Sequence, residues 1–125
     1  MPNRVLIVDD HAVVRAGLRL LLDGNPKWEV CGEAEDGEQA LREVARLAPD
    51  VVILDLTMPM MNGFQAAQDI RQIAPSTKIV FFSVHDVPTV AREAGADAFV
   101  AKSSGIEALL AAMDRVLQRG TTAGA

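Results

Sequence analysis

The chain has 125 residues, half of them apolar, so it is long enough to form one domain around a hydrophobic core. Its 17 acidic residues outnumber its 12 basic ones, and the formal charge of −5 with scattered Lys and Arg argues against direct nucleic-acid binding. A single cysteine, Cys31, excludes an internal disulfide, and neither a leader peptide nor an 18-residue apolar run is visible, so we expect a cytoplasmic domain with no membrane partner.

Short apolar runs alternate with stretches in which apolar residues recur every three or four positions. The runs predict buried strands at residues 5–8, 28–34, 51–54, 79–82 and 98–101, the second being the weakest. The periodic stretches predict helices with these apolar stripes: Val13, Val14, Leu18, Leu21 and Leu22; Ala40, Leu41, Val44 and Leu47; Phe64, Ala67, Ile70 and Ile73; Ile106, Leu109, Leu110, Met113, Val116 and Leu117. This alternation predicts an α/β fold, a doubly wound parallel sheet of five strands with helices on both faces.

Turn and capping residues mark the ends of these elements. The segment 23–26, Asp-Gly-Asn-Pro, ends the first helix, and Asp36 with Gly37 opens the second. Ser104, with Glu107 three residues later, fits a capping box for the last helix. We therefore predict one domain over residues 1–118 and a flexible tail, or the start of a linker, over residues 119–125.

Polar residues follow four of the five predicted strands. In an open parallel sheet, ligands bind at the carboxyl ends of the strands. The residues at those ends are Asp9 and Asp10 after the first strand, Asp55 after the third, Ser83 after the fourth and Lys102 after the fifth. Three carboxylates, a hydroxyl and an ammonium group are thus predicted to converge at one edge of the sheet.

This set of side chains suits a hard cation and phosphoryl chemistry. Three neighbouring carboxylates repel one another unless a positive charge compensates, and oxygen ligands suit Mg²⁺ or Mn²⁺. A zinc site is not indicated, because His11, His85 and Cys31 lie far apart in the sequence. An aspartate can also act as a nucleophile and form an aspartyl phosphate, whose oxygens a cation and a lysine would stabilise.

Four motifs together resemble the receiver domain of two-component response regulators. They are VLIVDDH (5–11), VVILDLTMPMMNGF (51–64), VFFSVHD (80–86) and GADAFVAK (95–102). The resemblance covers roughly residues 3 to 118, and the serine motif and the lysine without a following proline are most similar to the NarL/FixJ (LuxR-type) branch. It implies a flavodoxin-like (βα)5 fold with strand order 2-1-3-4-5.

The resemblance also implies a role for each matching residue. Asp55 would be the phosphoacceptor, and Lys102 and Ser83 would bond the phosphoryl group. Asp10, Asp55 and the backbone carbonyl of Thr57 would ligate Mg²⁺, with Asp9 acting through a metal-bound water. Ser83 and Phe99 would form the switch, and Thr57 and His85 would tune the lifetime of the phosphoryl group.

The sequence departs from the family pattern in the fourth helix. Only 18 residues separate Ser83 from Lys102, which is about one helical turn fewer than usual in the family. The missing turn falls within residues 87–95, so we expect a shortened fourth helix and an unusual output surface. Ser103 stands where the family often has a cis-proline, so no cis bond is expected there.

The function implied is a phosphorylation switch rather than an enzyme. A sensor histidine kinase would supply the phosphoryl group, and the surface of the fourth helix, fifth strand and last helix would control an output, which we expect to be transcription. Homodimerisation is a second partner expectation, and DNA would be contacted only through an output domain that these 125 residues do not contain.

Other interpretations stay open at this point. Asp10 by itself could cap a helix, Ser83 and Lys102 could be ordinary polar residues, Phe99 could be core, and His85 could be a solvated loop residue. The chain could also be a phosphorylation-independent binding module. A phosphohydrolase would need a second acid at position 57, where Thr57 stands. A cofactor carrier would need a phosphate-binding loop where Asp9 and Asp10 would repel phosphate.

Overall fold

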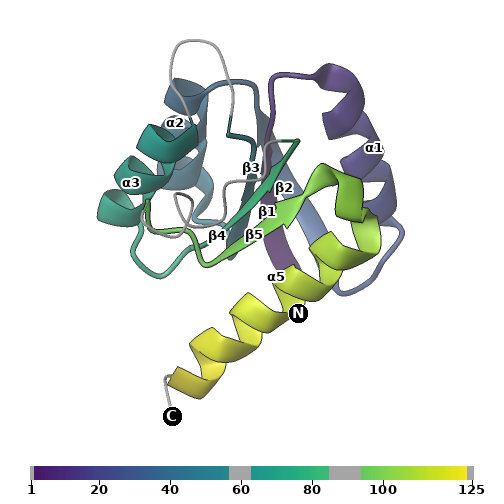
Figure 1. Ribbon diagram of the computed structural model, residues 1–125. Coiled ribbons are helices and arrows are strands. Elements are labelled where there is room, and N and C mark those ends of the chain that lie inside the picture. The colour runs from purple at the N-terminus through teal and green to yellow at the C-terminus, as the bar shows by residue number, and fades with distance from the viewer. Residues whose placement is uncertain (1, 57–62, 85–93, 124–125) are drawn as a thin grey trace.

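The fold is a five-stranded parallel sheet with helices on both faces (Figure 1). The computed structural model describes residues 2–56, 63–84 and 94–123. In chain order the elements are β1 (Asn3–Val8), α1 (Ala12–Asp23), β2 (Trp28–Ala34), α2 (Gly37–Leu47), β3 (Val51–Leu54), α3 (Gly63–Ile73), β4 (Lys78–Ser83), β5 (Ala98–Ala101), a 3-10 turn (Lys102–Ser104) and α5 (Ile106–Ala123). The strand order is β2-β1-β3-β4-β5, as predicted.

Alternate residues of each central strand face opposite sides of the sheet and form two cores. On one face, Leu6, Val8, Val52, Leu54 and Phe81 pack against α2 and α3. On the other face, the intervening residues Val5, Ile7, Val51, Ile53 and Val80 pack against α1 and α5. Both faces are covered, which explains why these strands are continuous apolar runs rather than alternating ones.

Edge strand β2 differs from the central strands. It pairs with β1, and the register shifts at one position, because Val5 lies opposite Val30 whereas Leu6 lies opposite Gly32. The skipped residue is Cys31, whose thiol donates to the carbonyl of Val5 at 3.4 Å. This bulge accounts for the weak apolar pattern of the second predicted strand.

The described helices α1, α2, α3 and α5 are where the sequence predicted them, but three residues of the expected apolar stripes are exposed: Val13, Leu21 and Ile73. Helix α1 buries Leu18 and Leu22. Val13 and Leu21 each lie about 100° around the helix from a neighbour that faces the sheet, and therefore point to solvent. The apolar pattern of α1 thus overestimated the width of its packed face.

The start of the last helix was predicted incorrectly. Ser104 is not the N-cap residue of α5; it belongs to the 3-10 turn, and α5 begins at Ile106, after Gly105. Gly105 adopts φ +88, a conformation that favours glycine, and its amide donates to the carbonyl of Lys102 at 3.2 Å. This turn moves the N-cap position from Ser104 to Gly105, so the helix starts one residue later than predicted.

The same helix ends later than expected. It continues to Ala123, beyond the boundary predicted at residue 118, because each added helical residue gains a backbone hydrogen bond and one internal glycine costs only about 1 kcal/mol. The domain boundary itself stays a prediction. In the described part of the chain, no helix is long and apolar enough to cross a membrane.

Candidate functional site

Strand register brings the first and third strand ends together. Val8 lies opposite Leu54 in the parallel pair of β1 and β3, so Asp9 and Asp55 follow at the same level. Backbone hydrogen bonds hold both positions, since Asp9 donates to Ala34 and Asp55 donates to Val8, each at 3.0 Å. The acidic edge is therefore fixed by the apolar strands that precede it.

Protein donors already occupy both carboxylate oxygens of Asp9. Lys102 Nζ lies 2.9 Å from Oδ2, and the backbone amide of His11 donates to Oδ1 at 2.9 Å. The Nδ1 atom of His11 lies 3.0 Å from the same Oδ1. Lys102 also lies 3.8 Å from Oδ2 of Asp55 and so bridges two strand ends. The Lys102 side chain is therefore mostly buried between these two carboxylates, and its role toward a phosphoryl group stays a prediction.

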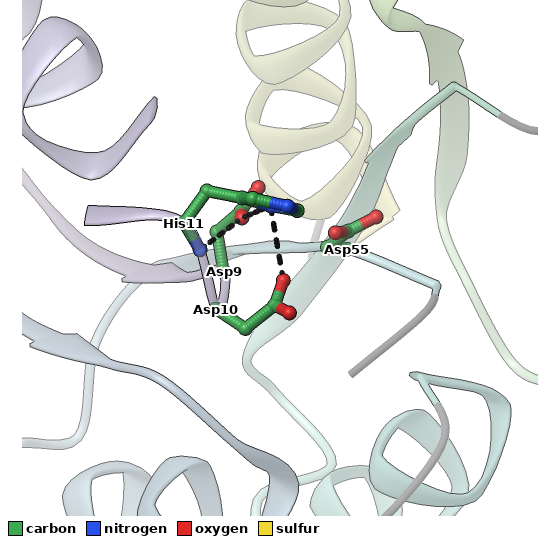
Figure 2. A group of neighbouring side chains, drawn as sticks. All are labelled: Asp9, Asp10, His11 and Asp55. Carbon is green, nitrogen blue, oxygen red and sulfur yellow. Dashed lines mark hydrogen bonds and ion pairs between the residues drawn. The ribbon is translucent and has the colours of Figure 1, made fainter. Parts of the chain in front are cut away.

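Asp10 does not cap α1. The N-cap residue of that helix is His11, which makes no side-chain capping bond. Oδ1 of Asp10 is buried and has no hydrogen-bond partner in the described structure, although His11 Nδ1 lies 3.0 Å away without hydrogen-bond alignment. Figure 2 shows the His11 ring joined to Asp9 and Asp10, with Asp55 at the end of the neighbouring strand.

Asp55 is a buried carboxylate whose negative charge is only partly stabilised by its neighbours. Burial raises the pKa of the Asp55 carboxyl above its ordinary value, and the charge of Asp9 adds to this rise. Lys102 and hydrogen bonds from Ser83 and the Leu56 backbone lower that pKa without cancelling the effect of burial. Oδ1 of Asp55 has no hydrogen-bond partner among the described residues. The positive charge of Lys102 is thus not enough to offset the burial of Asp55 next to Asp9.

Ser83 and Phe99 lie on neighbouring strands. Ser83 is the fully buried last residue of β4, and its hydroxyl hydrogen-bonds Asp55, so it lies in the site as predicted. Phe99 is half-buried in β5 opposite Phe81 and packs against the core on the α2/α3 face. Its position fits an aromatic close to the site, and its switching role stays a prediction.

Gly63 fixes the backbone next to the site. Its amide donates to the carbonyl of Leu56 at 2.7 Å. A Cβ atom at this position would lie 2.3 Å from the carbonyl oxygen of Asp55 and 2.7 Å from Cα of Leu56. Only glycine therefore permits this close approach.

Three of the predictions lie outside the described residues. They are the cation-ligating carbonyl and tuning role of Thr57, the tuning role of His85, and most of the shortened fourth helix over residues 87–95. The described site comprises Asp9, Asp10, His11, Asp55, Ser83 and Lys102.

Sequence analysis missed two residues that contact the site. Arg15 donates through Nη1 to the backbone carbonyl of Asp9 at 2.6 Å, and its Nε bonds Glu33 at 3.1 Å. Burial alone would raise the pKa of Glu33, but hydrogen bonds from Arg19 and Arg15 lower it overall. His11 was considered only as a zinc ligand, although its position directly after two aspartates was a usable signal.

The donor set fits a divalent cation. Asp9, Asp10, His11 and Asp55 each offer a ligand atom, and these atoms lie within 4.8 Å of one another. Two of the oxygens, on Asp10 and Asp55, are buried without hydrogen-bond partners, which is unfavourable unless a ligand satisfies them. Acidic oxygens in this number suit Mg²⁺ or Mn²⁺.

Comparison with known proteins identifies relatives over nearly the whole chain. The family described as "Response regulator receiver domain" matches residues 5–114. The nitrate/nitrite response regulator protein NarL of Escherichia coli (strain K12) is 40% identical over 116 residues, 90% of this chain and 53% of that protein. Transcriptional regulatory protein DegU of Brevibacillus brevis is 35% identical over 120 residues, 94% of this chain and 51% of that protein. The chain thus spans about half the length of these curated relatives.

Solved structures agree with the family match. A two-component response regulator of the LuxR family from an Aurantimonas species has a TM-score of 0.88 and 36% identity, covering 94% of this chain and 86% of that one. The signal receiver domain of the putative response regulator NarL from Mycobacterium tuberculosis has a TM-score of 0.82 and 33% identity, covering 96% and 97%. The chain therefore belongs to the response regulator receiver family of two-component systems and has its flavodoxin-like fold.

Proposed function

We propose that Asp55 accepts a phosphoryl group from the phosphohistidine of a sensor histidine kinase. The observation that carries this proposal is the buried Asp55 carboxylate, which has one oxygen without a hydrogen-bond partner and a lysine within 3.8 Å. A carboxylate in this position needs external positive charge to stay ionised, and it faces the edge of the sheet where ligands bind.

The transfer is a displacement at phosphorus. An oxygen of Asp55 forms the new P–O bond, the P–N bond to the kinase histidine breaks, and the leaving imidazole keeps the bonding electron pair and takes up a proton. Lys102, already held by Asp9 at 2.9 Å, neutralises charge on the phosphoryl oxygens. The hydroxyl of Ser83 then donates to one of these oxygens in place of the Asp55 carboxylate.

A divalent cation would be held by Asp10 and Asp55, and by the carbonyl of Thr57 if that prediction holds. When bound, Mg²⁺ would supply the positive charge that the phosphoryl oxygens and the acidic pair require. Asp9 would act through a water on the cation, because protein donors already engage both of its oxygens.

The phosphorylated state would change an output surface around Ser83, Phe99 and α5, and would control transcription through a further domain, as the names of the relatives indicate for those proteins. Receiver domains are not enzymes of the usual kind, and this one would support only its own phosphorylation and dephosphorylation. Cytoplasmic location and homodimerisation belong to the same proposal.

Intact-mass measurement after incubation with acetyl phosphate and Mg²⁺ tests the phosphoacceptor. We expect one phosphoryl adduct on the wild type and none on Asp55→Asn or with EDTA. Asp50→Asn is the matched control, because Asp50 is an exposed aspartate before β3 and an asparagine can still accept the bond from Arg4. An adduct that persists on Asp55→Asn would contradict the assignment. No adduct on folded wild type would favour the phosphorylation-independent binding module.

A further inference from the structure

The side chain of His11 points toward the acidic site and does not cap helix α1. It is the N-cap residue of α1 and makes no capping bond. Its Nδ1 atom instead lies 3.0 Å from Oδ1 of Asp9 and 3.0 Å from Oδ1 of Asp10 (Figure 2). The side chain is 63% exposed, so the ring lies at the open rim, where it can turn toward an incoming ion.

Besides Asp9, three residues of this cluster each offer a ligand atom. Both oxygens of Asp9 already accept from protein donors. Asp10 and Asp55 each offer an Oδ1 atom that is buried without a hydrogen-bond partner in the described structure, and His11 offers Nδ1. Two oxygens and a nitrogen on adjacent strand ends form a mixed donor set.

Releasing Nδ1 from Asp9 leaves no unsatisfied oxygen behind. The backbone amide of His11 donates to the same Oδ1 at 2.9 Å and stays in place when the ring turns. The ring can therefore exchange a hydrogen bond with Asp9 for a bond to a cation at little loss. Imidazole nitrogen suits Ni²⁺ and Zn²⁺, whereas Mg²⁺ takes oxygen ligands almost exclusively.

We propose that His11 supplies a nitrogen ligand, through Nδ1, to the cation site of Asp10 and Asp55 and shifts its preference from Mg²⁺ toward imidazole-binding metals. The proposal rests on the cation site of the proposed function. It makes His11 the residue that determines which divalent metal the acidic site selects.

Calorimetric titrations with Mg²⁺ and Ni²⁺ at pH 8, above the ordinary pKa of an imidazole, test this selectivity. A Cys31→Ser background removes the one thiol that could bind a soft metal. We expect His11→Ala to lower the ratio of the Mg²⁺ to the Ni²⁺ dissociation constant by at least about tenfold, with the Mg²⁺ constant within about threefold of wild type. His11→Asn, which offers an amide oxygen close to the position of Nδ1, should lose the Ni²⁺ preference while keeping Mg²⁺.

A spectroscopic titration identifies the ligand directly. With Zn²⁺ added to one equivalent, the ring resonances assigned to His11 should shift, whereas His85, the other histidine of the chain, serves as the internal reference. Equal metal ratios in the wild type and His11→Ala, or ring shifts confined to His85, would overturn the role of His11. Absence of Mg²⁺ binding to the folded wild type would instead overturn the cation site of the proposed function.

Discussion

Carboxylates lie at both ends of the parallel strands, but their surroundings differ. We call the end where the strands finish the carboxyl edge and the end where they begin the amino edge. At the carboxyl edge, made by Asp9, Asp10, Asp55 and Lys102, two buried carboxylate oxygens have no hydrogen-bond partner among the described residues. At the amino edge, Arg71 of α3 bonds the carboxylate of Asp97 at 2.6 Å, and the backbone amide of Ile79 donates to the same oxygen at 2.8 Å.

Arg71 also donates hydrogen bonds to three backbone carbonyls at the amino edge. Its guanidinium donates to the carbonyls of Pro75, Thr77 and Gly95 at 2.8–3.0 Å. A single arginine thus ties the end of α3 to the segments before β4 and β5. The carboxylate at the amino edge is paired with an arginine and a backbone amide, whereas the carboxyl edge leaves two carboxylate oxygens without hydrogen-bond partners among the described residues.

Gly63→Ala should have the largest effect on the carboxyl edge. The new methyl group would meet the backbone of Asp55 and Leu56 rather than a side chain that can move. We expect a loss of about 3 kcal/mol in the free energy of unfolding, measured by urea denaturation. The control is Gly17→Ala in α1, where an added Cβ meets nothing within 4 Å and should stabilise the helix by about 0.5–1 kcal/mol. Equal effects at the two positions would contradict this account of Gly63.

Arg71→Met tests whether the amino edge is structural. Loss of the guanidinium removes the charged donor from the Asp97 carboxylate, which keeps only the Ile79 amide, and removes the side-chain donor from three carbonyls, so we expect destabilisation of about 2 kcal/mol. Arg46→Met is the matched control, because among the described residues Arg46 pairs only with Glu43 on the surface of α2, and its loss should change stability by less than about 0.5 kcal/mol. Similar values for the two variants in thermal denaturation would remove the distinction between the edges.

Replacing an aspartate by asparagine should raise stability at the carboxyl edge and lower it at the amino edge. Asp55→Asn removes an undercompensated buried charge and should raise stability by roughly 1 kcal/mol at pH 7, whereas Asp97→Asn weakens the pair with Arg71 and should lower it by a similar amount. Urea denaturation of both variants measures the contrast. Destabilisation by Asp55→Asn would mean that Lys102 already satisfies the carboxyl edge.

The pH dependence provides a separate check on Asp55. Its pKa is raised in the folded protein, so the stability associated with its neutral form is complete below the unfolded value near 3.8 and is lost as the pH rises through the folded pKa. The stability gained by Asp55→Asn should therefore grow as the pH rises from about 3.8 through the folded pKa of Asp55, and should be constant above it. A gain that is constant with pH would show that the charge is not its cause.

The positions of Asp9, Asp55, Ser83 and Lys102 could be predicted because strand ends follow from continuous apolar runs. In a parallel sheet these ends meet at one edge, so residue type and strand order were sufficient. The start of α5 could not be found in the same way. A serine followed by a glutamate three residues later fits a capping box, but the left-handed Gly105 closes a separate 3-10 turn first.

Contacts made by long side chains could not be predicted from the sequence either. The reach of Arg15 to the carbonyl of Asp9 depends on the phase of α1 against β1 and on one rotamer among many. His11 was visible in the sequence, but its ring could equally have pointed to solvent. The exposure of Val13 shows the same limit, since the apolar pattern does not say how far the sheet extends beneath a helix.

Arg15→Met should have the smallest effect on stability and a specific effect on the carboxyl edge. Arg15 and Arg19 both bond Glu33, through Oε1 and Oε2 respectively, but only Arg15 also donates to the carbonyl of Asp9. Because that bond orients the backbone that carries Asp9 and Asp10, its loss should weaken Mg²⁺ binding by about threefold to tenfold while changing stability by less than about 1 kcal/mol.

Arg19→Met is the control for the shared partner, because it removes one bond to Glu33 and leaves the carbonyl of Asp9 untouched. Calorimetric titration with Mg²⁺ should separate the two variants, with Arg19→Met close to the wild type. If both variants weaken binding equally, the common cause is the charge near Glu33. If only Arg15→Met does so, the effect passes through the backbone of Asp9, and the acidic edge depends on the arginine that orients it as well as on the residues that would bind the cation.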